Sequence, residues 1–411
     1  RNIELLLAAL DQPQKSYPAV QIAGTNGKGS TAVVLESICR AAGIRTGLYT
    51  SPHLVSITER IRVGGDEISE EEFARGATVV RDAAERLMAA NQIEAPPTFF
   101  EQVTAIALIE FRKRKVGLAI LETGLGGRLD ATTAAGAEII GITTIALDHQ
   151  QYLGDTLAEI AAEKAAIIRP GVTAIIGNQP PEALEVILRQ CETNDVVPSL
   201  NDCRFEVDEV SRDGEMLVTF ESKQNRYPGL RVGLRGMHQL DNIAVALRLA
   251  ESLCERGLAI LPKAIGAGIE NAAHAGRLEL WPGPPHWLFD GAHNVAGALA
   301  LRQYLDSFMT KPITMVFGAM ADKNLSEIAA LLFPAARRLV LTQFANPRAA
   351  TIETLQDLVT VKGSPVEVQT ARSTAEAIAI AKEVTPAGDL ICVTGSLYLV
   401  GDMQRELRQA G

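Results

Sequence analysis

The chain has 411 residues, of which 47% are hydrophobic and 21% charged, a composition that excludes wholesale disorder, collagen and coiled coil. Its length predicts two domains rather than one. The formal net charge of −10 argues against nucleic-acid binding, which needs a basic surface, but not against an anionic small ligand held by a few cations and backbone amides.

No stretch of 18 apolar residues occurs, and the first residues do not form a signal peptide, so we expect no membrane span. The five cysteines are odd in number and form no C-x-x-C pair, which favours a reduced cytoplasmic protein without a zinc site. They are Cys39, Cys191, Cys203, Cys254 and Cys392.

In the first half of the chain, short apolar runs alternate with segments of helical period. This pattern predicts a mainly parallel α/β sheet with helices on both faces. The expected strands are 20–24, 46–50, 116–122, 139–147 and 173–177, and the expected helices are 29–42, 98–113, 156–168 and 181–191.

The pattern changes at 203–235, where polar and apolar residues alternate and Asp213-Gly214 and Pro228-Gly229 are turn signals. We predict a small antiparallel sheet there, followed by helices at 239–255 and 262–272. The segment WPGPP at 281–285 indicates a break.

After the break the α/β alternation restarts. The expected strands are 286–290, 313–318, 338–344, 366–369 and 389–394. We therefore predict a first α/β domain at 1–275, a linker at 276–285 and a Rossmann-like α/β domain at 286–411.

The strongest chemical signal is GTNGKGST at 24–31, directly after a strand and opening a helix. Such a loop points successive amides at an anion, the helix N-terminus adds a favourable dipole, and the lysine supplies a point charge. The alternative is a glycine-rich turn with an exposed lysine, because a glycine separates the lysine from the serine. The predicted phosphate-binding residues are Thr25, Asn26, Gly27, Lys28, Gly29 and Ser30.

Three further polar residues follow predicted strands at the same edge of the sheet, where ligands of parallel sheets bind. They are Ser51 in TSPHL, Glu122 in LETGLGGRLDAT, and His149 after Asp148. The carboxylate of Glu122 suits Mg²⁺, although it could instead cap a turn. A single histidine at such a position is more often structural than a ligand.

Lys164 lies on the apolar face of the predicted helix 156–168, together with Leu157, Ile160 and Ala161. An ammonium on a buried stripe is costly. Either the side chain extends to the surface, or the lysine is carbamylated and its new anionic head ligates a second Mg²⁺.

The second half of the chain adds a further polar set. Asn242 lies in a predicted helix, Arg277 lies in the connector, and Asp290 and His293 lie in DGAHN at a strand end. These positions suggest a nucleotide held between two domains. Taken singly, each residue could be an ordinary hydrogen-bonded polar group.

Taken in order, these motifs and EKAAIIRPG and TGSLYLVGD closely resemble the folylpolyglutamate synthase and dihydrofolate synthase family of the Mur-ligase superfamily. The resemblance runs from about residue 16 to the C-terminus. It departs from the family pattern at Thr133, Ala166 and Val295, none of which is a presumed ligand.

The resemblance implies that 1–275 is an ATP-binding domain of the P-loop ATPase type, and it implies a role for each matching residue. Thr25–Ser30 would hold the ATP phosphates, Ser51 and Glu122 the first Mg²⁺, and His149 and carbamylated Lys164 the second. Lys28, Glu122, His149, Lys164 and His293 would be catalytic. Asn242, Arg277 and Asp290 would contact ATP, and Thr98, Leu129, Asp130 and Ala131 would lie at the pteridine site. Asp130 would accept paired hydrogen bonds from the pterin, or it would only cap its loop.

The implied reaction joins L-glutamate to dihydropteroate, and further glutamates to folates, through an acyl phosphate in a monomeric protein. A monofunctional folylpolyglutamate synthase would carry nearly the same motifs. Another Mur-type ligase, an ATP-gated binding module and a plain phosphotransferase are the more distant alternatives.

Overall fold

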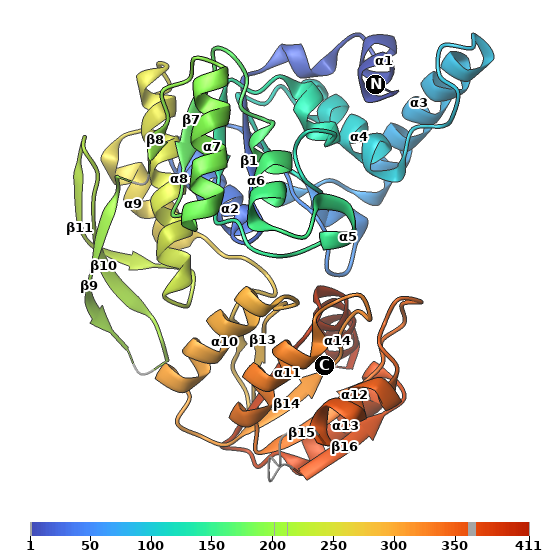
Figure 1. Ribbon diagram of the computed structural model, residues 1–411, viewed down its shortest axis with the longest axis vertical. Coiled ribbons are helices and arrows are strands. Elements are labelled where there is room, and N and C mark those ends of the chain that lie inside the picture. Colours follow the sequence, from blue (N-terminus) through green and yellow to red (C-terminus); the bar gives the residue numbers. More distant parts are fainter. Residues whose placement is uncertain (1, 201, 212, 361–366, 411) are drawn as a thin grey trace.

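The computed structural model describes residues 2–200, 202–211, 213–360 and 367–410, which form two lobes joined near residue 275 (Figure 1). The N-terminal lobe, blue to yellow in the figure, lies above the C-terminal lobe, orange to red. Each lobe is built on its own sheet, and a third, small sheet flanks the N-terminal lobe. No helix in these ranges is long and apolar enough to cross a bilayer.

The N-terminal lobe contains an eight-stranded sheet in the order β4-β3-β2-β5-β1-β6-β7-β8. Its strands pair in parallel except for the β2–β3 and β3–β4 pairs at one edge. Every residue of the central strands β1, β5 and β6 is buried, as expected for a parallel sheet covered on both faces. The bounds are β1 Ala19–Ala23, β2 Thr46–Tyr49, β3 Ile61–Val63, β4 Asp66–Glu67, β5 Leu118–Glu122, β6 Ile139–Ile142, β7 Thr173–Ile176 and β8 Ser199–Leu200.

Helices cover both faces of this sheet. One face packs on α2 (Lys28–Ala41), α8 (His238–Glu255) and α9 (Pro262–Asn271). The other face packs on α1 (Asn2–Ala9), α3 (Glu70–Ala89), α4 (Phe99–Lys113), α6 (Leu157–Ala165) and α7 (Pro181–Thr193), and the short α5 (Gln150–Leu153) precedes α6.

Capping boxes fix where three of these helices begin. Ser69, Thr98 and Thr156 each accept a hydrogen bond from the backbone of a glutamate three residues later, and that glutamate bonds back. Such reciprocal bonds satisfy two otherwise unpaired amides of the first turn. Thr98, predicted as a substrate residue, therefore also starts α4.

The small antiparallel sheet predicted at 203–235 is present as β9 (Arg204–Val210), β10 (Met216–Glu221) and β11 (Arg226–Val232). The turn signal at Pro228-Gly229 is wrong, because both residues lie inside β11. The register between β10 and β11 shifts between Val218 and Phe220, and this irregularity accommodates a proline and a glycine within a strand.

The C-terminal lobe contains a six-stranded sheet in the order β12-β13-β17-β14-β15-β16, parallel except for β12. Strand β12 (Glu279–Trp281) lies inside the range predicted as linker and pairs with β13 (His286–Phe289). The other bounds are β14 Ile313–Phe317, β15 Arg338–Thr342, β16 Glu367–Ala371, β17 Leu390–Thr394, α10 Val295–Phe308, α11 Leu325–Leu332, α12 Ile352–Thr360, α13 Thr374–Val384 and α14 Leu397–Ala410.

The structure confirms the predicted fold class, with several differences in the first lobe. Strand β6 ends at Ile142, so the predicted strand 139–147 is too long. The 20-residue helix α3 and the β3–β4 hairpin were not predicted.

Candidate active site

The phosphate loop connects β1 to α2, as predicted, but its first two amides point away from the helix axis. The amides of Thr25 and Asn26 donate to the carbonyl of Thr144, at 3.0 and 3.3 Å. The hydroxyl of Thr25 also bonds to both backbone groups of Ala146. These two amides therefore fasten the loop to the segment after β6, while both residues still line the cavity.

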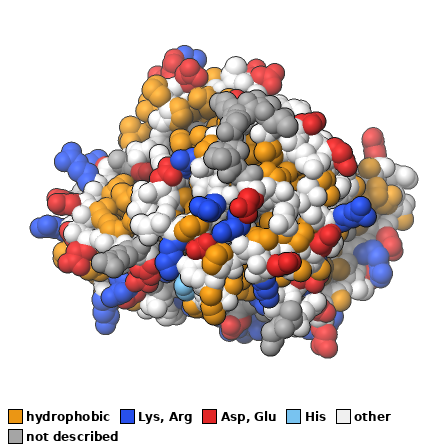
Figure 2. Space-filling model, turned by 90° about the horizontal axis from the view of Figure 1, so that it is seen from below, with side chains coloured by type: hydrophobic (Ala, Val, Ile, Leu, Met, Phe, Trp, Pro, Cys, Tyr) orange, Lys and Arg blue, Asp and Glu red, His pale blue; other side chains and the backbone are white. Residues whose placement is uncertain are grey.

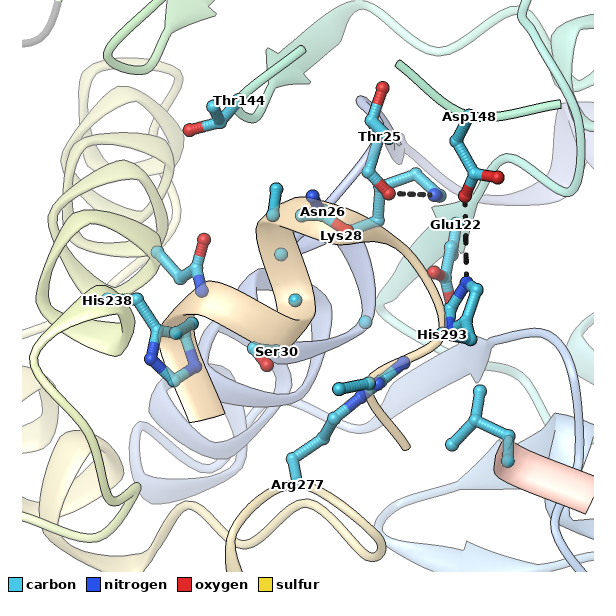
Figure 3. Close-up of a pocket in the computed structure, with 18 of the residues that line it drawn as sticks. Thr25, Asn26, Lys28, Ser30, Glu122, Thr144, Asp148, His238, Arg277 and His293 are labelled. Atoms are coloured by element: carbon cyan, nitrogen blue, oxygen red, sulfur yellow. Dashed lines mark hydrogen bonds and ion pairs between the residues drawn. The ribbon is translucent and has the colours of Figure 1, made fainter. Parts of the chain in front are cut away.

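The next four amides are free to bind an anion. Among the described residues, the N–H groups of Gly27, Lys28, Gly29 and Ser30 have no hydrogen-bond partner, and they form the first turn of α2. The ammonium of Lys28 lies 3.1 Å from the carbonyl oxygen of Thr25 (Figure 3). Free amides, a helix dipole and a lysine at one point make a phosphate site.

Gly27 has a conformation and an environment that only glycine tolerates. Its φ is +88°, and a Cβ added there would lie 1.9 Å from Oδ1 of Asn242. Asn242, on α8, also accepts a hydrogen bond at its carbonyl from Thr31. The loop is thus seated tightly on α8, which brings Asn242 to the site.

Glu122 ends β5 and reaches the same loop. Its side chain is 5% exposed, and Oε2 accepts a hydrogen bond of 3.1 Å from the amide of Ser51. Burial raises the pKa of Glu122, and the nearby Lys28, the Ser51 amide and Arg277 oppose that rise. The sequence-predicted pair Ser51 and Glu122 is therefore in direct contact.

Asp148 connects the two lobes beside the phosphate loop (Figure 3). One carboxylate oxygen lies 2.6 Å from Nζ of Lys323, and the other accepts from Nδ2 of Asn294 at 3.1 Å and lies 3.6 Å from Nε2 of His293. Burial alone would raise the pKa of Asp148, but the hydrogen bond and charge of His293, with His149 and Lys323, bring it well below its usual range.

His149 follows in a left-handed backbone conformation, with φ 52°. Its Nε2 lies 3.9 Å from the Asp148 carboxylate. Burial lowers the pKa of His149 to about 4, so the imidazole is neutral at pH 7 and able to act as a metal ligand.

Lys164 is buried on α6, as the helical period predicts, and is 4% exposed. Among the described residues its ammonium makes no hydrogen bond or ion pair. Burial and the charge of Lys28 lower its pKa to about 7, although Asp148 and Asp130 act in the other direction. The side chain lines the cavity of the phosphate loop and does not reach the surface.

The remaining predicted nucleotide residues line the same cavity, and Figure 3 shows Arg277 beside the start of α2. Arg277 comes from the connector, and Asp290 follows β13. Both oxygens of Asp290 accept backbone amides, from Leu278 at 3.0 Å and Ala292 at 2.9 Å, so this carboxylate also shapes the turn that carries His293.

His274 was missed from the sequence. Its Nδ1 lies 3.1 Å from the hydroxyl of Ser30, and a Cβ added to Gly29 would lie 2.8 Å from its ring. Burial, with the charge of Arg277, lowers its pKa to about 3. His238 was also missed; it lines the same cavity, and burial lowers its pKa to about 4.

Two adjoining cavities contain all the predicted site residues. The first, about 380 Å³, is lined by every residue predicted for phosphate, metal, nucleotide and catalysis. The second, about 710 Å³, is lined by Thr98, Leu129, Asp130 and Ala131. Residues common to both walls are Ser51, Pro52, Gly124, Leu125, His149, His293 and Leu397.

The predicted pairing of Asp130 with a pterin does not agree with its surroundings. One carboxylate oxygen accepts the amides of Gly124 and Leu125, at 2.8 and 3.0 Å, and the other accepts the amide and hydroxyl of Thr132, at 2.9 and 2.5 Å. Four donors use the lone pairs of a carboxylate. Asp130 therefore holds the loop, while Leu129, 67% exposed, is free to contact a ligand.

The residues near the phosphate loop fit a magnesium ion that is held jointly by protein and substrate phosphates. No group of three or more His, Cys, Asp or Glu in the described part of the chain is arranged to hold a metal by itself. Mg²⁺ is usually held by one or two carboxylates together with substrate phosphates and water. The Glu122 carboxylate matches that set, because it lines the cavity of the phosphate loop beside Ser51, whose backbone amide donates to it.

The comparisons with known proteins agree with this geometry. The Mur ligase middle domain model matches residues 22–250, and the Mur ligase glutamate ligase domain model matches residues 276–397. A dihydrofolate synthase/folylpolyglutamate synthase of Bacillus subtilis is 34% identical over 99% of this chain and 94% of the relative. The chain belongs to the folylpolyglutamate and dihydrofolate synthase family of Mur ligases.

Solved members of this family have the same fold. A Mycobacterium tuberculosis folylpolyglutamate synthase complexed with ADP superimposes with a TM-score of 0.91 at 33% identity, covering 99% of this chain and 93% of that one. A bifunctional folylpolyglutamate synthase/dihydrofolate synthase with Mn, AMPPNP and L-glutamate bound gives 0.86 at 28% identity, covering 99% and 93%. As a member of this family, the present chain is an ATP-dependent ligase.

Proposed function

We propose that this protein adds L-glutamate to dihydropteroate and to tetrahydrofolate glutamates through an acyl phosphate. The observation that carries the proposal is the junction of the two cavities, whose shared wall includes Ser51, His149 and His293. A carboxylate entering from the second cavity would meet a nucleotide phosphate from the first at this junction.

The nucleotide would bind in the first cavity. The free amides of residues 27–30 and the ammonium of Lys28 supply positive charge for the β- and γ-phosphates. Asn242, Arg277 and Asp290 line the same cavity and would hold the rest of the nucleotide. A bound nucleotide and a divalent metal in solved relatives support this assignment.

Two Mg²⁺ ions would complete the site. Ser51 and Glu122 would hold the first, and His149 and carbamylated Lys164 the second. Bound there, the ions supply charge neutralisation for phosphoryl transfer. The low pKa of Lys164 supports carbamylation, because only the neutral amine reacts with CO₂ to give a carbamate and a proton.

The chemistry would then proceed in two steps. Attack of the substrate carboxylate on the γ-phosphorus gives the acyl phosphate and ADP, and attack of the glutamate amine on the acyl carbon gives the amide and phosphate. The amine must first lose a proton. His293 is not arranged to accept it, because its Nδ1 donates to the carbonyl of Gly291 at 2.8 Å and its Nε2 faces the Asp148 carboxylate at 3.6 Å. With both ring nitrogens directed at acceptors, His293 would instead stabilise negative charge at the junction.

The second cavity suits a flat, partly apolar acid. Leu125 and Leu129 are 40% and 67% exposed and line it, with Thr98 and Ala131. Arg60 and Arg348 line it as well, and neither has a carboxylate partner within the described residues. These two guanidinium groups are suited to the carboxylates of folate and glutamate.

Small-molecule substrates, a monomer and a cytoplasmic location complete the proposal. The surface of the C-terminal lobe argues against nucleic-acid binding. Figure 2 shows basic and acidic side chains mixed among apolar ones on this face, rather than a basic stripe. All five cysteines are free thiols, in keeping with a reducing compartment.

The direct test supplies dihydropteroate and tetrahydrofolate separately, each with ATP, Mg²⁺ and labelled glutamate, and identifies the products by mass. We expect a glutamyl product from both. A product from tetrahydrofolate alone would favour a monofunctional folylpolyglutamate synthase, and ADP release that does not depend on glutamate would overturn the proposal.

A further inference from the structure

The first turn of α10 brings the C-terminal lobe onto two loops of the N-terminal lobe. Asn294 caps the helix, with Oδ1 accepting the amide of Gly297 at 2.8 Å. Its Nδ2 donates to Oδ1 of Asn26 at 3.0 Å and to Oδ2 of Asp148 at 3.1 Å. A carboxamide has two N–H donors, so Asn294 uses both of them across the boundary between the lobes.

Lys323 makes a second contact with the same carboxylate. It lies between β14 and α11, and its Nζ is 2.6 Å from Oδ1 of Asp148. The two side chains are 10% and 8% exposed, so solvent screens the pair little. Each oxygen of Asp148 is thus held by a different residue of the C-terminal lobe.

One of the loops held in this way belongs to the phosphate site, and the other belongs to the junction of the two cavities. Asn26 precedes the free amides of the phosphate loop, and Asp148 precedes His149, which belongs to the wall shared by both cavities. A change in the position of the C-terminal lobe would therefore change the position of both loops together.

We propose that Asn294 and Lys323 are positioning residues that hold Asp148 and Asn26 in an interlobe clamp, and that this clamp keeps the cleft closed while the acyl phosphate exists. The inference rests on the proposed function, because it concerns the fate of that intermediate. An acyl phosphate reacts with water to return the acid and phosphate, so an open cleft would spend ATP without forming an amide.

Asn294 lines neither cavity, so a change there weakens the clamp without altering a wall of the site, whereas Lys323 also lines the second cavity. Asn294→Ser removes the carboxamide but keeps a hydroxyl that caps α10. Lys323→Met removes the ammonium and keeps the length of the side chain, and Lys323→Arg keeps the ion pair. Tyr304→Phe is the matched control, because Tyr304 also links the lobes, by a 3.0 Å hydrogen bond to the carbonyl of Asp213, but lines neither cavity.

The measurement is the amount of ADP released per amide formed, with ATP, Mg²⁺, glutamate and tetrahydrofolate supplied to the full chain. We expect a ratio near one for the wild type, Lys323→Arg and Tyr304→Phe. Asn294→Ser and Lys323→Met should raise it roughly ten-fold, as the closed population falls. The extra ADP should require tetrahydrofolate, because the intermediate must form before water can destroy it.

Three outcomes are distinguishable. ADP and amide that fall together at a ratio near one in both Asn294→Ser and Lys323→Met would overturn the clamp. An equal rise in Tyr304→Phe would also overturn it, since any lobe contact would then suffice. A wild type that forms no amide overturns the proposed function instead. If Lys323→Met does not fold, Asn294→Ser decides, because it retains every charge.

Discussion

Lys164 shows how far one residue can be understood from its position. A lysine seven residues after Leu157 falls on the apolar face of α6, and the structure buries it at 4% exposure. The simpler of the two sequence hypotheses was that the side chain extends to the surface, and the structure shows that it does not. A buried ammonium without an anionic partner in the described residues is unfavourable. A carbamate bound to the proposed Mg²⁺ would remove this cation without leaving its own negative charge unpaired.

We predict that Lys164 is carbamylated. Burial lowers its pKa to about 7, so the neutral amine that reacts with CO₂ increases as pH rises through 7. At a fixed CO₂ pressure the carbamate should increase from pH 6 to pH 8. It is measured as a ¹³C NMR carbamate signal after exposure to ¹³CO₂.

The matched variant is Lys164→Arg, which keeps a cation but cannot form the carbamate. It should lack the signal and the ligase activity, and bicarbonate should not restore either. A fully active wild type with no carbamate signal at pH 8 would refute this prediction.

Other site residues could be predicted only where they belong to a recognisable sequence motif. Glu122 and Ser51 were predicted because each follows a strand, and the structure joins them at 3.1 Å. His274 follows no strand and belongs to no glycine-rich loop, so nothing in its neighbourhood distinguishes it. For Asp130 the structure favours loop capping over pairing with a pterin, because four loop donors surround its carboxylate, and spacing alone does not describe such loop folding.

At the scale of elements, the start of α2 determines how phosphate can bind. Gly27 takes a left-handed conformation there and packs against Asn242. A side chain at this position would push the loop from α8 and turn its amides away from a bound anion.

We therefore expect Gly27→Ala to raise the KM for ATP by roughly 30-fold, the equivalent of about 2 kcal/mol of strain and displacement. Gly43→Ala is the control: its φ is +78° and nothing lies within 4 Å of an added Cβ. It should lower the melting temperature slightly and leave the KM unchanged. Equal effects of the two changes on KM would show that backbone strain alone is responsible.

Elements were predictable where packing and local sequence agree. The buried strands β1 and β5 and the helix α8 follow directly from their apolar pattern. The segment 143–147 is apolar enough to continue β6, but Thr144 and Ala146 instead bond to the phosphate loop. Helix α3 was overlooked although it has a buried stripe at helical spacing, because glycine and alanine make up much of that stripe: Gly76, Val80, Ala83, Ala84 and Leu87.

At the scale of the whole molecule, function depends on contacts that no local pattern contains. The Asp148–Lys323 pair joins residues 175 positions apart, and Arg277 enters the cavity from the connector between lobes. The sequence predicted the two α/β halves and the residues at their strand ends. It could not specify which side chains meet across the cleft, because the relative placement of the lobes sets those distances.

The central claim is that a carboxylate is activated as an acyl phosphate in this cleft. The most direct measurement uses tetrahydrofolate labelled with ¹⁸O in its glutamate γ-carboxylate, with ATP, Mg²⁺ and unlabelled glutamate, and analyses the released phosphate by mass spectrometry. Because the attacking carboxylate oxygen leaves with the phosphoryl group, we predict one ¹⁸O in phosphate for each amide formed. Amide formation with unlabelled phosphate would contradict the account.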